Sequence, residues 1–252
     1  MALLEAQGIT KRFSGITALD AVSLDVEAGE AVGLIGPNGA GKTTFFNCLL
    51  GLLRPDGGTV TFADQDVTRL PVYRRARAGI GRTFQRMELF AEMTVRDHLL
   101  VAERSRLGTG RFWRDVLNLS APTTDERQRA DSTLDLLGLT AVADAPIESL
   151  TLGQGRLVEV GRALMTGPRL LLLDEPSSGL DAGETAALAD TLRNVQADRE
   201  TAVLLVEHDV DFVRAFVSRV FVLDFGTRIA TGPTDGVLAS DEVRRAYLGE
   251  TV

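Results

Sequence analysis

The sequence predicts an α/β fold, in which a parallel sheet is covered by helices, and two observations support this. Short apolar runs typical of fully buried strands recur at Ala31 to Ile35, Leu170 to Leu173, Ala202 to Val206 and Val220 to Leu223. Segments with helical periodicity lie between these runs. Since parallel strands need crossover connections, the alternation predicts a parallel sheet flanked by helices.

The helical segments and a second, smaller sheet can be placed along the chain. Helices are predicted at Lys42 to Leu50, Glu184 to Val195 and Val210 to Val217. The first 30 residues and Thr59 to Phe62 instead show alternating apolar positions beside glycine turns. This pattern predicts a small antiparallel sheet at one edge of the core.

The middle of the chain is predicted to be a helical lobe. From Thr94 to Ala163 the pattern is helical, and capping-box starts occur at Thr94-Val-Arg-Asp97 and at Thr123-Thr-Asp-Glu126. We therefore predict one domain, 1–252, divided into a core with an edge sheet, 1–86 and 166–252, and an inserted helical subdomain at about 87–165.

Composition narrows the function classes. The net charge of −8 argues against a surface devoted to nucleic acid or anionic lipid. No apolar stretch is long enough for a transmembrane helix, and Met1 to Glu5 lacks the features of a secretory signal. The single cysteine, Cys48, permits no internal disulfide and is expected to be a small packed residue. Together these features favour the cytosol.

One arginine-rich stretch stands out in this acidic chain. We interpret it as a solvated helix face, with a docking surface as the alternative. Its members are Arg69, Arg74, Arg75, Arg77, Arg82 and Arg86.

A glycine-rich loop after the first apolar run matches the G-x4-G-K-[ST] phosphate-loop pattern. Its glycines let successive backbone N–H groups point at phosphate oxygens, and the following helix adds a favourable dipole. Lys42 is predicted to reach the β and γ phosphates, and Thr43 to offer its hydroxyl to Mg²⁺. The predicted nucleotide-binding residues of the loop are Gly36, Pro37, Asn38, Gly39, Ala40, Gly41, Lys42, Thr43 and Thr44. The pattern alone leaves kinases, GTPases and ATPases open.

Two adjacent acids end the second apolar run. Asp174 and Glu175 follow Leu170 to Leu173, at the edge where open α/β sheets bind ligands. We predict that Asp174 holds Mg²⁺ and that Glu175 polarises the attacking water as a general base. An adjacent Asp-Glu pair suits hydrolysis by water better than transfer to a substrate hydroxyl. This favours an ATPase over a small-molecule kinase.

The segment Leu150-Thr-Leu-Gly-Gln154 precedes the acid pair and leads into a helix predicted at Arg156 to Met165. It resembles the L-S-x-G-Q signature of ABC ATPases. Thr151 and Gln154 also fit a capping box, and the two roles are compatible. Leu152 replaces a common glycine of that signature, while Thr151 keeps the hydroxyl of its serine.

The resemblance to ABC ATPases covers essentially the whole chain and implies further site residues. It implies that Phe13 stacks on adenine, with a core aromatic as the alternative, that Gln85 contributes to catalysis and to the Mg²⁺ site, and that His208 is the switch histidine. It places Asp181 in the D-loop and implies a head-to-tail dimer. In such a dimer, ATP lies between one phosphate loop and Thr151, Gly153 and Gln154 of the second subunit.

Several segments are similar to one subgroup, the branched-chain amino-acid importer ATPases. These segments are Gly81 to Gln85, Leu89 to Val95, Glu207 to Asp209 and Ala246 to Glu250. ATPases of urea or amide import and of lipopolysaccharide export share part of the pattern and remain alternatives. A non-transport ABC ATPase is disfavoured, because the chain lacks a tandem ATPase unit or a long coiled-coil insertion.

The subgroup resemblance also implies partners and a location. It implies permease subunits in the membrane, a second ATPase subunit that is identical or homologous, and indirectly a substrate-binding protein. The chain would act peripherally at the cytoplasmic face of the cell membrane. The permease is expected to dock on an apolar cluster around Gln85, formed by Phe84, Met87, Leu89 and Phe90.

Overall fold

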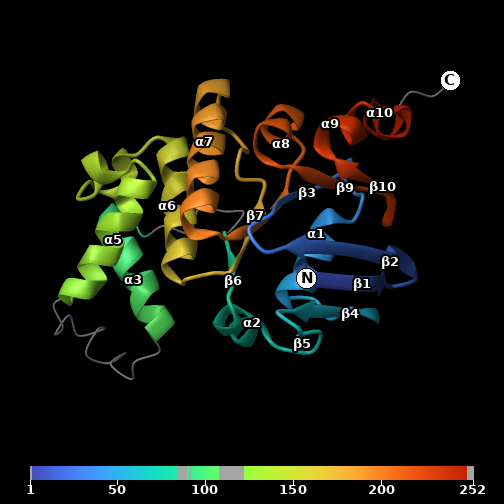
Figure 1. The fold of residues 1–252 in the computed structure, drawn as a ribbon, viewed down its shortest axis with the longest axis horizontal. Coiled ribbons are helices and arrows are strands. Elements are labelled where there is room, and N and C mark those ends of the chain that lie inside the picture. The colour runs from blue at the N-terminus through green and yellow to red at the C-terminus, as the bar shows by residue number, and fades with distance from the viewer. Residues whose placement is uncertain (1, 84–89, 91, 108–121, 249–252) are drawn as a thin grey trace.

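A computed structural model describes residues 2–83, 90, 92–107 and 122–248. Two sheets and a set of helices make up the fold (Figure 1). The smaller sheet is antiparallel with strand order β2-β1-β4-β5. Its strands are β1 (Ala2–Phe13), β2 (Ile16–Glu27), β4 (Gly57–Phe62) and β5 (Gln65–Asp66).

The larger sheet has strand order β10-β9-β3-β8-β7-β6 and is parallel except for the β9–β10 pair. Its strands are β3 (Ala31–Ile35), β6 (Ile80–Arg82), β7 (Leu170–Asp174), β8 (Ala202–Val206), β9 (Arg219–Asp224) and β10 (Thr227–Pro233). Five neighbouring strands therefore end at one edge, where the candidate site lies.

Helices cover the larger sheet, and three of them form a lobe to one side (Figure 1). The lobe contains α3 (Val95–Leu107), α5 (Thr124–Leu136) and α6 (Leu152–Met165), with short 3-10 turns at Thr140–Val142 and Ile147–Ser149. The other helices are α1 (Lys42–Leu50), α2 (Val72–Ala78), α7 (Ala182–Arg199), α8 (Val210–Phe216), α9 (Thr234–Leu238) and α10 (Asp241–Leu248). No helix of the described ranges is both long and apolar enough to cross a membrane.

Side chains of the larger sheet alternate between two hydrophobic cores. Along β7, Leu170 and Leu172 face the core shared with α1 and the smaller sheet, whereas Leu171 and Leu173 face the core shared with the helical lobe. All four are fully buried. Burial on both faces explains why this strand is a continuous apolar run instead of an alternating one.

The predicted fold class is confirmed, and so are the four apolar strands and the antiparallel sheet. Three short or exposed strands, β5, β6 and β10, were not predicted from the sequence. Ile80–Arg82 is only three residues long and contains a glycine and an arginine, so it has no apolar run. Thr227–Pro233 is an antiparallel edge strand whose residues are partly or fully exposed, and it likewise lacks the pattern of a buried strand.

The helices of the lobe begin at capping boxes, as expected at Thr94, Thr123 and Thr151. In each box the threonine side chain accepts a hydrogen bond from the N–H three residues later, and that residue's side chain accepts one from the threonine N–H. The box at Thr151 corrects the predicted helix Arg156 to Met165, because α6 begins at Leu152. Gly153 and Gly155 obscured this start, since glycine is a poor helix former.

The arginine-rich stretch corrects a second expectation, since Arg75 is buried and not solvated. Its guanidinium donates to four carbonyls, those of Cys48 (2.9 Å), Leu49 (2.6 Å), Thr68 (2.9 Å) and Leu70 (3.0 Å). Two of these carbonyls belong to the last turn of α1. A cation is favourable there, at the negative end of the helix dipole.

Replacing Arg75 with methionine is expected to lower the free energy of unfolding by about 2–4 kcal/mol, because several buried carbonyls lose their donors. Arg77, which is exposed on the same helix, provides the matched control. Arg77→Met should change stability by no more than about 0.5 kcal/mol. Urea denaturation of both variants measures the difference, and equal effects would contradict this role for Arg75.

Candidate nucleotide site

The phosphate-loop residues connect β3 to α1, and two of the glycines are required by close packing. Gly36 has a φ of 149°, and a Cβ there would lie 2.1 Å from the carbonyl oxygen of Leu223. Gly41 has a φ of 100°, and its Cβ would lie 2.7 Å from the carbonyl oxygen of Ala18. Both conformations favour glycine, so the loop can follow this path only with glycine at these positions.

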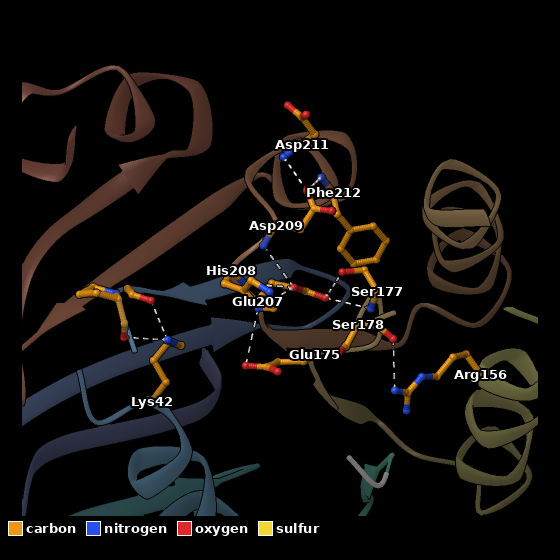
Figure 2. Close-up of polar contacts among 12 residues, drawn as sticks. Lys42, Arg156, Glu175, Ser177, Ser178, Glu207, His208, Asp209, Asp211 and Phe212 are labelled. Carbon is orange, nitrogen blue, oxygen red and sulfur yellow. Dashed lines mark hydrogen bonds and ion pairs between the residues drawn. The ribbon is translucent and has the colours of Figure 1, made fainter. Parts of the chain in front are cut away.

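Lys42 is a buried cation within the loop (Figure 2). Its Nζ donates to the carbonyls of Gly36 (2.6 Å) and Pro37 (3.0 Å). Burial lowers the pKa of this ammonium, and the carboxylates of Glu175 and Asp174 partly oppose that effect. A desolvated ammonium whose hydrogen bonds go to neutral carbonyls would be stabilised by an anionic ligand such as a phosphate.

Asp174 and Glu175 lie at the carboxyl end of β7, as predicted. Burial raises the pKa of Asp174 to about 6, with a further increase from the neighbouring Glu175, while Arg82 and Lys42 act in the opposite direction. The buried carboxylate of Asp174, with that of Glu175 next to it in the chain, favours a cation between the two acids and a ligand. Their chemistry therefore fits Mg²⁺, which prefers oxygen ligands.

No group of three or more His, Cys, Asp or Glu side chains in the described ranges could hold a metal alone. A magnesium ion would therefore need other oxygens, and Mg²⁺ commonly keeps waters and binds substrate phosphates. The hydroxyl of Thr43 is available, since that side chain lies exposed in the first turn of α1.

Glu175 has an unusual backbone conformation for a residue with a side chain. Its φ is 47°, in the left-handed region. The conformation is held by its N–H, which donates to the carbonyl of Val206 (2.9 Å), and by its carbonyl, which accepts from the N–H of Ser178 (3.1 Å). Strain of this kind costs on the order of 1–3 kcal/mol and is concentrated at functional sites.

His208 follows β8 and lies beside Glu175 (Figure 2). Its Nδ1 is 3.7 Å from Oε1 of Glu175 and 3.8 Å from Oε2 of Glu207. The imidazole is half exposed, whereas Glu207 is completely buried. The sequence analysis gave Glu207 no role in the site, although an acid that directly ends a buried apolar strand was a usable sign.

The signature segment, Leu150 to Gln154, lies at the start of α6. The N–H of Gly153 donates to Oε1 of Glu184 in α7 (3.4 Å). The predicted D-loop residue Asp181 is the N-cap of α7, and its own N–H donates to Oε2 of the same Glu184 (3.4 Å). One carboxylate therefore contacts the backbone at the start of both helices.

Phe13 ends β1, and its ring is partly exposed, at 42%. This excludes the alternative of a core aromatic. The Nζ of Lys11 lies 5.4 Å from the centre of the ring. A flat exposed ring is suited to stacking on a base.

Several predicted positions cannot be compared with the structure. Gln85, Phe84, Met87 and Leu89 lie outside the described residues. Phe90 is described, and its ring is exposed and stacks on that of His98. The structure thus brings together the phosphate loop, the acid pair and His208.

Asp174→Asn is expected to stabilise the ligand-free protein in a pH-dependent way. Asp174 binds its proton more tightly in the folded state, so its stabilising contribution is complete below pH 3.8 and is lost as the pH rises through about 6. The unfolding free energy of the variant should therefore exceed that of the wild type by a margin that grows from pH 4 to pH 7, to at most roughly 3 kcal/mol. Urea denaturation without nucleotide or Mg²⁺ measures this margin. A margin independent of pH would contradict the raised pKa of Asp174 in the folded state.

Comparisons with known proteins agree with this geometry. The family model for ABC transporters matches residues 19–178. The high-affinity branched-chain amino acid transport ATP-binding protein LivG of Salmonella typhimurium is 40% identical, over 98% of each chain. BraF of Pseudomonas aeruginosa, which carries the same description, is 38% identical over 98% of each chain.

Solved structures give the same result. The ADP conformation of the ATP-binding cassette MJ1267 has a TM-score of 0.88 and 33% identity, over 99% of this chain and all of that one. The dimeric cassette MJ0796 bound to ADP and phosphate has a TM-score of 0.74 and 25% identity, over 92% of this chain and 98% of that one. The chain therefore belongs to the ABC transporter family, and it is an ATP-hydrolysing subunit of that family.

Proposed function

We propose that this chain energises the import of branched-chain amino acids through a membrane permease. The observation that carries the proposal is the 40% identity to LivG over 98% of both chains. The near-complete coverage matters, because the likeness includes the helical lobe and the C-terminal segments as well as the nucleotide site. The permease, a second ATPase subunit and the position at the cytoplasmic face of the membrane belong to the same proposal.

Nucleotide binding is assigned to the phosphate loop and to Phe13. The N–H groups of the loop and the dipole of α1 would bind the phosphates, and Lys42 would neutralise the β and γ oxygens. Phe13 would stack on the adenine. The buried state of Lys42 and the exposed state of Phe13 both support these roles.

Mg²⁺ would be held by Thr43 and Asp174, and the family resemblance adds Gln85. The ion would neutralise charge that develops on the transferred phosphate. Asp174 suits this role, because burial and the neighbouring Glu175 raise its pKa, and Arg82 and Lys42 only partly oppose that shift, so a further cation would stabilise the carboxylate.

Glu175 would orient and polarise the attacking water, and His208 would act next to it on the γ-phosphate side. The 3.7 Å separation between His208 Nδ1 and Glu175 Oε1 supports a shared task. The left-handed backbone of Glu175 fixes the direction in which its side chain leaves the main chain. The position of the attacking water would therefore be set by backbone geometry.

A second subunit would complete each site. The N-terminus of α6, with Thr151, Gly153 and Gln154, presents a positive dipole end that suits a γ-phosphate. The capping box at Thr151 holds the start of this helix in place. Asp181, at the start of α7, would lie at the same interface.

The permease would dock beside the helical lobe. An apolar cavity of about 300 Å³ lies between α2, β6, α3 and α6, where Val72, Ile80, Val101 and Ala163 contribute to its lining. Phe90, whose ring is exposed, precedes α3. A cavity of this size suits one or two apolar side chains of a partner helix, although Arg82, Glu159 and Arg162 also contribute to its lining.

Glu175→Gln is expected to reduce ATP turnover by at least about a hundredfold, because the amide is a poor base, while ATP binding is retained. The ATP-bound variant should then elute as a dimer in size-exclusion chromatography. Phosphate release and nucleotide binding, measured on the same preparation, separate the two effects. Turnover near that of the wild type would remove Glu175 as the base.

The transported substrate is tested by isolating the permease with this chain from detergent-solubilised membranes. The complex is then reconstituted in liposomes with its substrate-binding protein. Leucine is expected to stimulate ATP hydrolysis and to accumulate in the liposomes, whereas urea should do neither. Stimulation by urea alone would replace the amino-acid proposal with an amide importer.

The docking site is tested with Phe90→Asp, which should prevent co-purification of the permease without affecting ATP binding. Ile16→Asp is the matched control, because Ile16 is also exposed but lies in the antiparallel sheet, away from the helical lobe (Figure 1). Retention of the permease by the Phe90 variant would place the docking surface elsewhere.

A further inference from the structure

Glu207 is a completely buried acid whose carboxylate accepts four hydrogen bonds. Oε1 accepts from the backbone N–H of Ser177 (2.9 Å) and from its hydroxyl (2.6 Å). Oε2 accepts from the backbone N–H groups of His208 (3.0 Å) and Asp209 (3.3 Å). Four donors therefore surround the side chain. A carboxylate that only accepts satisfies all of them, whereas the amide of a glutamine would not.

The two oxygens of Glu207 bind two different loops (Figure 2). Ser177 lies two residues after Glu175, in the turn that leaves β7. His208 and Asp209 form the start of the loop that leaves β8. One carboxylate thus joins the turn that carries the catalytic base to the loop that carries the switch histidine.

The position of this charge has an electrostatic cost beside Asp174, although it also favours the ammonium of Lys42. Glu207 is among the groups that raise the pKa of Asp174, so it adds a third carboxylate to a site already rich in negative charge. Burying a charge costs free energy that a neutral residue of similar size would avoid. The four hydrogen bonds offset part of this cost, and they do so by joining two loops of the site.

The geometry of the base depends on the turn that Glu207 anchors. Glu175 has a left-handed backbone, and its carbonyl accepts a hydrogen bond from the N–H of Ser178, the residue after Ser177. If Ser177 is released, the strained backbone of Glu175 is free to relax. The distance of 3.7 Å between Glu175 Oε1 and His208 Nδ1 would then no longer be fixed by the turn at Ser177.

We propose that Glu207 is a positioning residue that locks the base Glu175 and the switch histidine His208 into one arrangement. It acts through Ser177 and through the backbone of residues 208 and 209, and it does not touch the nucleotide. This inference rests on the roles assigned to Glu175 and His208 in the proposed function. It adds a residue that the phosphate-loop, acid-pair and signature motifs do not include.

The principal test is Glu207→Gln, which keeps size and shape but introduces two N–H groups among four donors. The amide nitrogen is expected to turn toward Ser177, whose hydroxyl can accept a hydrogen bond, because the N–H groups of His208 and Asp209 cannot. The Ser177 N–H then loses its acceptor. Turnover per ATP-binding site should fall by about ten- to a hundredfold, with the KM for ATP changed by less than about threefold.

A milder variant covers the case in which Glu207→Gln fails to fold. Ser177→Ala removes one donor of the four, so its turnover should fall less, by about three- to tenfold, again with little change in KM. Sites are counted by ATP binding, so that loss of folded protein is not mistaken for loss of rate. Turnover per site equal to that of the wild type in both variants would overturn the proposal.

The matched control is Glu103→Gln in the helical lobe. Glu103 is also a buried acid, and it forms ion pairs with Arg106 (2.7 Å) and Arg129 (3.4 Å). Its replacement should lower the melting temperature, while turnover per ATP-binding site stays within about twofold of the wild type. If Glu103→Gln slowed turnover as much as Glu207→Gln, a general effect of losing a buried charge would explain both results, and the proposal would fail.

A double-mutant cycle decides whether Glu207 acts through the base. If it does, adding Glu207→Gln to Glu175→Gln should slow the residual single turnover by less than about twofold, because the positioned group is already gone. Independent effects would multiply, and that result would overturn the proposal. Normal turnover in Glu175→Gln alone would instead reject the assigned base, so the two failures are distinguishable.

Discussion

The candidate nucleotide site depends on one electrostatic constraint, the desolvation of opposite charges at the carboxyl edge of the larger sheet. Lys42 is buried beneath the phosphate loop, while Asp174, Glu175 and Glu207 lie at the ends of β7 and β8. The lowered pKa of Lys42 and the raised pKa of Asp174 both arise mainly from burial. The ligand-free site is therefore electrostatically unfavourable, and a bound magnesium nucleotide would supply the missing charges of both signs.

The rest of the fold keeps these charges in place. Strands that are apolar on both faces hold the sheet edge rigid, and α1 is anchored at both ends, by the glycine loop at its start and by Arg75 at its last turn. The central strands leave little room for adjustment, because their leucines pack against a core on either side. Movement during a catalytic cycle is therefore expected in loops and in the helical lobe, not in the sheet.

Local sequence patterns predicted the parts of the structure that local physics determines. The buried strands could be predicted because a run of four or five apolar residues between turns is typical of a strand buried on both faces. Thr123 could be predicted as a helix start because a capping box involves residues only three positions apart. The phosphate loop and the acid pair follow from the same reasoning, since each combines a strand end with polar residues. Their assembly at one edge follows from the parallel order of the strands.

The parts that sequence patterns missed depend on contacts between distant segments. Arg75 looked like one of several exposed arginines, and only the fold brings the carbonyls of α1 to its guanidinium. Glu207 binds Ser177, thirty positions away in the chain. Short β6 was missed for a similar reason, because its place in the sheet is set by pairing with β7 and not by its own three residues.

The carboxylate of Glu184 would couple the two nucleotide sites of a dimer. It receives a long hydrogen bond from Gly153 and another from Asp181, so the starts of α6 and α7 are linked by a single side chain. In a head-to-tail dimer both starts would face the opposite subunit. A rotation of the lobe that released one contact would disturb the other. A change at one nucleotide would then be transmitted to the opposite site through the side chain of Glu184 alone.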